Sequence, residues 1–201
     1  MRRCSLRYHG KQVHDILQTV SGKGMVLKMG KVNYALLYQL LDNLTPLRED
    51  CGSVCGSACC SKCNGDDDES GMLLFPGEPV SEDTTVRMIE KDGMRLEICE
   101  GKCERGHRPL ACRIFPLFPF VGSDGRVRVV YDPRAYGVCP LLQYNGIARI
   151  QPEFVRAVRR IGRLLLEDEA CKAFLMDQSQ EIAMLYRLSP LREARLPICR
   201  R

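Results

Sequence analysis

Cysteine is the residue that most constrains this chain. Of its 201 residues, twelve are cysteines, and nine of these fall between positions 51 and 139. The first thirty residues contain no apolar run of signal-peptide length, so we expect a cytoplasmic protein. In a reducing compartment clustered cysteines bind metal or carry out redox chemistry, because cellular reductants keep structural disulfides rare. The sequence therefore predicts a metal centre in the middle of the chain.

The nine central cysteines form two groups with the short spacing of metal ligands. The first group comprises Cys51, Cys55, Cys59, Cys60 and Cys63, and the second comprises Cys99, Cys103, Cys112 and Cys139. Small residues separate the cysteines of the first group, so the backbone can bend around an ion and the sulfurs remain uncrowded. Neighbouring side chains diverge, which makes it difficult for Cys59 and Cys60 to bind one ion. Either they serve two metals, or one is a ligand and the other bridges or packs.

Basic residues accompany the second group. Four cationic side chains lie close to its cysteines in the sequence: Lys102, Arg105, Arg108 and Arg113. Their positive charge is expected to lower the pKa of the thiols and to offset the negative charge of a thiolate-rich centre. We interpret Arg108 and Arg113 as residues that support the ligands. The nearby His107 is interpreted as a surface or supporting residue, because thiolates already exceed the four ligands of a tetrahedral ion.

The net charge of +5 is concentrated at the N-terminus. Residues 1–31 contain seven Lys or Arg and a single acidic residue, Asp15, so the rest of the chain is close to neutral. We interpret residues 1–30 as a basic, loosely ordered arm, which could be an upstream extension of a gene that starts at Met25 or Met29. Nucleic acid is not expected as a partner of the remaining domain. No stretch approaches the ~18 consecutive apolar residues of a membrane span, so no membrane partner is expected.

Local patterns predict a single α+β domain over residues 31–201. Apolar residues recur every three or four positions over 31–45 and again over 152–188, which indicates helices on either side of the cysteines. Pro46 ends the first helix. Residues 47–140 are expected to form a small, irregular cysteine-rich core with two hairpins, one pairing 86–90 with 94–99 and the other pairing 118–121 with 127–131. The first hairpin delivers Cys99 at its end.

Several motifs together resemble one known family. They are the run from Cys55-Gly56 to Cys59-Cys60, the segments Leu-Leu-Phe-Pro-Gly-Glu at 73–78 and Arg-Pro-Leu-Ala-Cys-Arg-Ile-Phe-Pro at 108–116, and Cys139-Pro140. This combination is similar to the YkgJ-like cysteine-cluster proteins, a zinc- or iron-chelating domain, over about residues 44–141. The resemblance implies a bound zinc or iron centre and no particular reaction. The matching cysteines, which it implies as ligands, are Cys51, Cys55, Cys59, Cys60, Cys99, Cys103, Cys112 and Cys139.

The first group departs from the family pattern in one respect. Three residues, rather than the commoner two, separate Cys51, Cys55 and Cys59, so the ligands within this group stay unassigned. Four cysteines are left over, because any cysteine at ligand spacing from them is already assigned. We interpret these four as ordinary thiols: Cys4, Cys63, Cys171 and Cys199.

Metal binding leaves three classes of function open. Eight thiolates can form two four-cysteine zinc sites, or hold one [4Fe–4S] cluster with four cysteines left over. The first hypothesis is a metal-binding module whose centre organises residues 47–140. The second is an iron–sulfur oxidoreductase or transferase, since flagellin lysine methylases look similar in their cysteine clusters. Against it, the sequence has no nucleophile elbow, no glycine-rich nucleotide loop and no paired general acid and base. The third is nucleic-acid binding through the basic arm and the arginine-rich helix that begins at Pro152, and the acidic residues that follow this helix disfavour it.

Overall fold

The computed structural model describes residues 32–60, 71–80, 86–91, 93–99, 105–143 and 150–188. The predicted arm, Lys102 and four of the cysteines lie outside these residues; the four are Cys4, Cys63, Cys103 and Cys199. The described chain is α+β, as predicted, with two small antiparallel sheets and helices before and after them. None of its helices is both long enough and apolar enough to cross a membrane.

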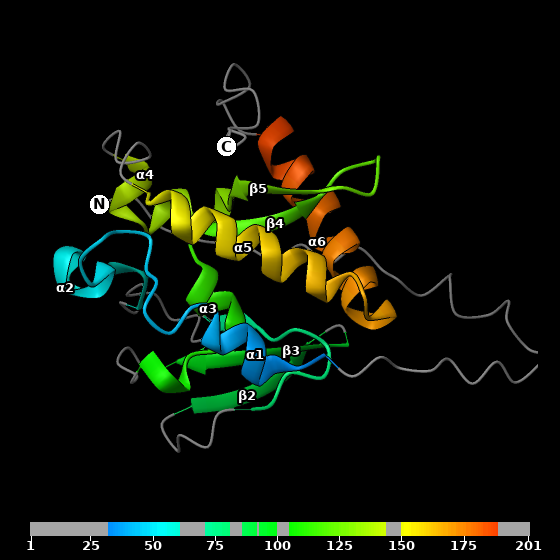
Figure 1. Ribbon diagram of the computed structural model, residues 1–201, viewed down its shortest axis with the longest axis horizontal. Helices are drawn as coiled ribbons and strands as arrows, with labels where there is room; N and C mark the ends of the chain where they lie inside the picture. Colours follow the sequence, from blue (N-terminus) through cyan, green and yellow to red (C-terminus); the bar gives the residue numbers. More distant parts are fainter. Residues whose placement is uncertain are drawn as a thin grey trace, which may run out of the picture.

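One sheet is the hairpin of β4 (Leu117–Val121) and β5 (Val127–Tyr131), which confirms the second predicted hairpin. Gly125 lies in its turn with a φ of 72°, a conformation that favours glycine. Two long helices, α5 (Pro152–Leu165) and α6 (Glu169–Leu188), pack against β4, and Figure 1 shows both beside the hairpin. Gly162 permits this close approach, because a Cβ on it would lie 2.5 Å from the Cβ of Pro119.

The second sheet has three antiparallel strands in the order β1–β3–β2. Strands β2 (Val86–Lys91) and β3 (Met94–Cys99) form the other predicted hairpin, whereas the short β1 (Gly71–Leu73) was not predicted. The register pairs Val86 with Cys99 at one end of the hairpin and Lys91 with Met94 at the other. Its turn includes Gly93, which has a φ of 73°.

The N-terminal helix is shorter than predicted. Helix α1 covers Tyr34–Gln39 instead of residues 31–45, and turns follow it. The backbone tightens after Gln39, because the N–H groups of Leu41 and Leu44 donate to carbonyls only three residues back. The carbonyls of Leu41 and Leu44 accept hydrogen bonds from the side chain of Arg105, which lies far along the chain. A tertiary contact therefore supports these turns where a longer helix was expected.

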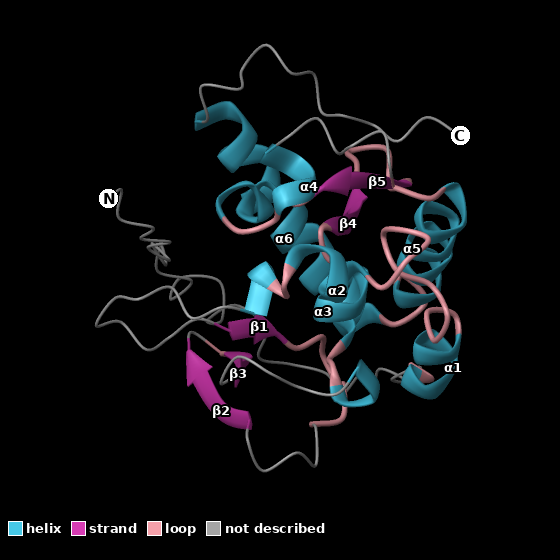
Figure 2. Cartoon of the chain, turned by 90° about the vertical axis from the view of Figure 1, so that its left-hand side faces the viewer, coloured by secondary structure: helices cyan, strands magenta, loops and turns pink. Residues whose placement is uncertain are grey.

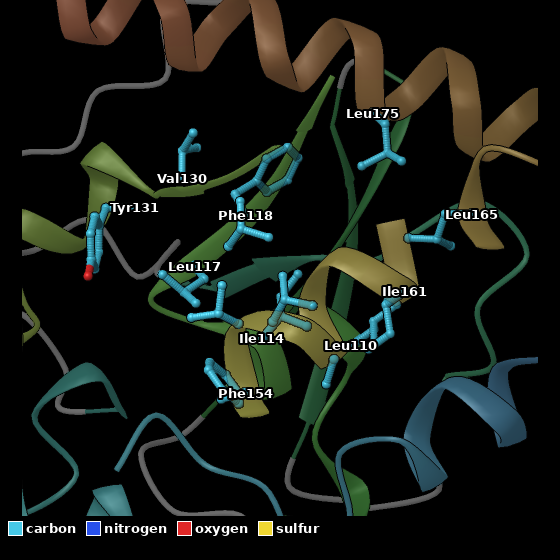
Figure 3. Close-up of a cluster of buried hydrophobic side chains, with 14 of the residues drawn as sticks. Leu110, Ile114, Leu117, Phe118, Val130, Tyr131, Phe154, Ile161, Leu165 and Leu175 are labelled. Carbon is cyan, nitrogen blue, oxygen red and sulfur yellow. The ribbon is translucent and has the colours of Figure 1, made fainter. Parts of the chain in front are cut away.

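Helix α3 (Leu110–Ile114) links the hydrophobic core to the cysteines. Figures 1 and 2 both show it between the two sheets. Its residues Leu110 and Ile114 are almost completely buried and lie four positions apart, so they share one helix face. Figure 3 shows this core, whose labelled residues are Leu110, Ile114, Leu117, Phe118, Val130, Tyr131, Phe154, Ile161, Leu165 and Leu175.

Short helical segments complete the described chain. They are α2 (Cys51–Cys55), η1 (Ala58–Cys60), η2 (Arg105–His107), η3 (Pro133–Gly137) and α4 (Pro140–Gln143), where η denotes a 3₁₀ helix. Most of the described cysteines lie in or beside these segments rather than in the long helices. The core of α5, α6 and the β4–β5 hairpin therefore acts as a support on which the cysteine-bearing turns are arranged.

Candidate metal centre

Helix α2 presents two thiols on one face. The Asp50 carboxylate caps its first turn by accepting from the N–H of Ser53 at 2.8 Å. Gly56 ends the helix in the left-handed conformation, with a φ of 63°. Cys51 and Cys55 are four positions apart, so a helical turn places their side chains next to each other. The three-residue spacing that departs from the family pattern is therefore the spacing of neighbours on an α-helix.

A reversal of the chain after α2 brings a third thiol to the same place. Ser57 follows Gly56 with a positive φ of 55°, and its N–H donates to the carbonyl of Gly52 at 2.8 Å. The 3₁₀ turn Ala58–Cys60 comes next and carries Cys59, whose side chain is exposed. Two successive residues with positive φ thus redirect the backbone so that Cys59 turns back towards α2.

The remaining two thiols come from distant parts of the chain. Cys112 is on α3, two positions from both Leu110 and Ile114, so it lies off the face that these residues bury. Cys139 lies between η3 and α4, and its N–H donates to the carbonyl of Ala135 at 2.8 Å. The Cys139 side chain is buried. Both thiols are therefore held by backbone segments that pack on the hydrophobic core.

These five thiols line one cavity of about 50 Å³. They are Cys51, Cys55, Cys59, Cys112 and Cys139. A water-sized species needs roughly 10–15 Å³ of such space, so the cavity has room for a small number of them. The rest of the wall consists of Asp50, Gly52, Ser57, Arg105, Arg108, Arg113 and the apolar residues Pro46, Phe115, Pro116 and Pro140. Five of the eight predicted ligands are thus brought together.

The thiols are close enough to influence one another. The pKa of Cys51 is raised to about 12 by burial, by the charges of Cys55 and Cys139, by a hydrogen bond with Cys55 and by Asp50. Burial also raises the pKa of Cys139, although the N–H groups of Leu141 and Leu142 donate to its sulfur and lower it. The arginines were predicted to lower the pKa of the second group's thiols, and this prediction is wrong in direction for Cys139, because desolvation raises its pKa.

The chemistry of the donor set fits zinc or iron, since both ions favour thiolates. The coordination sphere itself is not assembled: within the described residues, no group of three or more His, Cys, Asp or Glu side chains is placed to hold an ion. The thiols share the walls of one cavity, and rotation of their side chains would be needed for several to contact the same ion. The three remaining predicted ligands are not described here, because Cys103 and the side chains of Cys60 and Cys99 lie outside the described part of the chain.

Three arginines line the cavity together with the thiols. Arg113 is buried; its Nε donates to the Arg108 carbonyl at 2.8 Å, and its guanidinium lies 4.3 Å from the Tyr38 ring centroid. Arg105 is half-buried and donates to two carbonyls after α1. Its pKa is lowered by burial and by the charges of Arg108 and Arg113. Arg108 and Arg113 line the same cavity as Cys112, and their role in supporting the ligands stays a prediction.

Two acidic residues that support the site were missed. Asp50 caps α2, and a residue of this type immediately before the first cysteine is a helix-start signal that could have been recognised. Glu78 is buried, and its carboxylate accepts from the N–H of Leu110 at 2.6 Å, from the N–H of Phe75 at 2.9 Å and from the hydroxyl of Tyr38 at 2.8 Å. It anchors the first turn of the helix that carries Cys112. Its only sequence signal was membership in the family-like segment 73–78.

His107 and Cys171, which were not predicted to be ligands, do not line the cavity. His107 is exposed at the end of η2. Cys171, on α6, is buried, and its sulfur lies 3.5 Å from the hydroxyl of Tyr34 and 3.5 Å from the carbonyl of Pro76. Burial raises the pKa of Cys171 to about 11, which keeps it a neutral thiol near pH 7. Its interpretation as an ordinary thiol agrees with this environment.

No family model, no curated protein and no solved structure matches this chain. The resemblance to the YkgJ-like cysteine-cluster proteins rests on the motifs alone. Three of the four motifs coincide with elements that line the cavity: the run 55–60 includes the end of α2 and η1, the segment 108–116 includes α3, and Cys139-Pro140 spans the start of α4, whereas the segment 73–78 does not line it.

Proposed function

We propose that this chain is a cysteine-cluster metal-binding protein whose centre holds zinc or iron between α2, α3 and the start of α4. One observation carries the proposal: thiols from residues 51–59, 112 and 139, which are far apart in the sequence, line the same cavity. Thiols that only fill a hydrophobic core have no reason to gather at one cavity, as the separate position of Cys171 illustrates. We infer that a shared ligand brings these five together.

Electrostatics supports a cation as that ligand. Burial and then the charges of Cys55 and Cys139 raise the pKa of Cys51, so ionisation of several thiols in the cavity is favoured by an added positive charge. A metal ion supplies that charge and displaces the thiol protons, while Arg105, Arg108 and Arg113 offset the remaining negative charge of the complex. The N–H groups of Leu141 and Leu142 would stabilise the sulfur of Cys139 once a metal has displaced its proton.

A metal in this cavity would join elements that are otherwise linked by few contacts. Helix α2 has only five residues and no fully buried side chain, so its own packing contributes little to its stability. Ligation would fasten it to α3 and to the segment around Cys139, both of which pack on the core. The proposed centre is thus first an organiser of the cysteine-bearing turns, with ligation energy contributing directly to folding.

An iron–sulfur redox or group-transfer centre is the second candidate. The observation that favours it is the surplus of thiols: five line the cavity, so one thiol would remain beside a cluster held by four cysteines and be available for redox or transfer chemistry. Bound zinc would supply a structural link or a Lewis acid, and an iron–sulfur cluster would supply electron transfer. The two candidates share the same residues and differ in the metal.

Metal analysis of the full chain distinguishes these candidates. The protein should be purified without oxygen and without a metal-affinity tag, and its zinc, iron and acid-labile sulfide measured beside its absorption spectrum. A colourless protein with zinc supports the structural centre, and a brown protein absorbing near ~400 nm supports the iron–sulfur centre. Protein that contains neither metal, and that takes up neither zinc nor iron with sulfide on reconstitution, would overturn the proposed function.

A further inference from the structure

The five cavity thiols differ in their access to solvent. Cys139 is only 5 % exposed, and Cys51, Cys55 and Cys112 are half-buried. Cys59 is exposed, although it lines the same cavity. The cavity therefore has a buried end at Cys139 and an end at Cys59 that a small molecule in solution can reach.

The thiols also differ in how their backbone is held. Cys51 and Cys55 belong to a helix that is capped at both ends, and Cys112 belongs to a helix whose Leu110 and Ile114 are buried in the core. Cys59 belongs to a single three-residue turn that follows the positive-φ residues Gly56 and Ser57. A thiol on such a short turn can move away from its neighbours with less disturbance of packed structure than the other four.

The charge on the cavity wall is predominantly positive. Three guanidinium side chains and one carboxylate, that of Asp50, belong to the lining. Arg105 donates to neutral carbonyls, and Arg113 does the same apart from a contact with the exposed Asp42 at 3.5 Å. The bonds to carbonyls orient Arg105 and Arg113 without cancelling their charge. A small molecule that enters the cavity is therefore attracted if it is an anion.

We propose that Cys59 is the exchangeable thiol of the centre and that a small anionic thiol, one carrying a carboxylate, takes its place beside the arginines. The inference rests on the proposed metal centre and adds the class of molecule with which it exchanges a ligand. In the exchange the incoming thiol gives its proton to the Cys59 sulfur and binds through its own sulfur, so Cys59 leaves as a neutral thiol. No electrons are transferred, and no further reactant is required.

The first part of the test locates the exchangeable thiol with cobalt(II) as the probe metal. The full chain, loaded with cobalt(II) without oxygen, is treated with neutral iodoacetamide, and the alkylation of each cysteine is followed by mass spectrometry of peptides. Cys59 should react several times faster than Cys55 and Cys139, and all three should react alike in urea. If cobalt binds and Cys59 is protected from alkylation to the same extent as Cys139, the inference is overturned and the proposed function still stands. Failure to bind cobalt, zinc or iron at all would overturn the proposed function itself.

The second part tests whether Cys59 is a ligand and whether the arginines select anions. In the cobalt-loaded Cys59→Ser variant, the sulfur-to-cobalt charge-transfer absorption should be weaker and should return when a thiol is added. 3-Mercaptopropionate should restore it at about tenfold lower concentration than the neutral 3-mercaptopropanol, a ratio expected for one charge near the protein surface. The additional substitution Arg108→Gln should reduce that preference.

Two results would contradict this second part. Charge-transfer absorption that is the same in the Cys59→Ser variant and the natural sequence would show that Cys59 is not a ligand. Equal titration curves for the acid and the alcohol would show that the arginines do not select an anionic thiol. The two thiols have the same chain length, so their comparison isolates the charge of the carboxylate.

Discussion

Replacement of Arg113 by lysine should lower the free energy of unfolding of the protein by several kilocalories per mole. Arg113 is buried beside Cys112, and its Nε and Nη2 donate to the carbonyls of Arg108 and Gly106, while its guanidinium stacks on Tyr38. Lysine has one compact ammonium group, so it can replace one of these hydrogen bonds and cannot stack in the same way. A hydrogen bond to a charged donor contributes about 1.5–3 kcal/mol, and a cation–π contact about 0.5–1 kcal/mol. We expect Arg113→Lys to lower the free energy of unfolding by about 2–4 kcal/mol.

Urea unfolding followed by far-ultraviolet circular dichroism measures this loss. The matched control is Arg156→Lys on the outer face of α5, where the side chain is exposed and pairs with Glu153 at 2.7 Å. That change should stay within about 0.5 kcal/mol of the natural sequence. An Arg113→Lys protein as stable as this control would refute the argument that the buried guanidinium holds the 105–108 segment to α1 and α3.

Three further predictions test the packing, the electrostatics and the metal separately. Gly162→Ala should destabilise the protein by about 1–3 kcal/mol in the same assay, because the alanine Cβ would lie 2.5 Å from Pro119 and 2.8 Å from Val127. Alanine is the better helix former, so a rise in stability would contradict the close packing of α5 on β4. Burial raises the pKa of Glu78, so its contribution to stability is complete below the pKa of the unfolded chain and is lost as pH rises through the native pKa. The stability advantage of the natural sequence over Glu78→Gln, from urea midpoints at a series of pH values, should shrink as pH rises, and a constant difference would refute this. Removal of metal by a chelator should increase amide hydrogen exchange in α2 while the β4–β5 hairpin stays protected, because ligation stabilises only the cysteine-bearing turns. An equal increase in exchange in α2 and in the hairpin would argue against a local centre.

The elements that could be predicted from the sequence are those with a local signal. Helix α5 was evident because Phe154, Val158, Ile161 and Leu165 repeat with the period of one helix face, and all four are buried. Both hairpins were predicted from the turn residues between apolar runs, and Gly93 and Gly125 have the positive φ that such turns require. These patterns depend on residues within one turn or one hairpin, so no tertiary information was needed.

The cysteine-bearing turns could not be predicted with the same success. Helix α2 has the sequence Cys-Gly-Ser-Val-Cys, in which no residue strongly favours a helix, and its caps supply the only signal. Strand β1 has three residues, too few for an alternating pattern. The predicted helix over residues 31–45 was too long, since the turns after Gln39 are supported by Arg105, more than sixty positions away.

The site could be predicted in its residue types and only partly in its geometry. Spacing and family motifs selected eight cysteines, and five of them line one cavity. Which thiols approach one another depends on how α3 and the segment around Cys139 pack on the core, and no local pattern encodes this. The predicted direction of the Cys139 pKa shift was wrong for the same reason: nearby arginines are visible in the sequence, whereas the burial of the Cys139 thiol is not.

The central claim is that three separate segments supply ligands to one metal centre. The measurement that tests it most directly is the metal content of three single variants, one per segment, purified without oxygen: Cys55→Ser, Cys112→Ser and Cys139→Ser. The control is Cys171→Ser, which alters a thiol outside the cavity. We predict that each of the three variants loses most of its metal or binds it far more weakly, while the control retains the full content of the natural sequence. Full metal content in the Cys112→Ser and Cys139→Ser variants would contradict the account, because the thiols would then line the same cavity without sharing a metal.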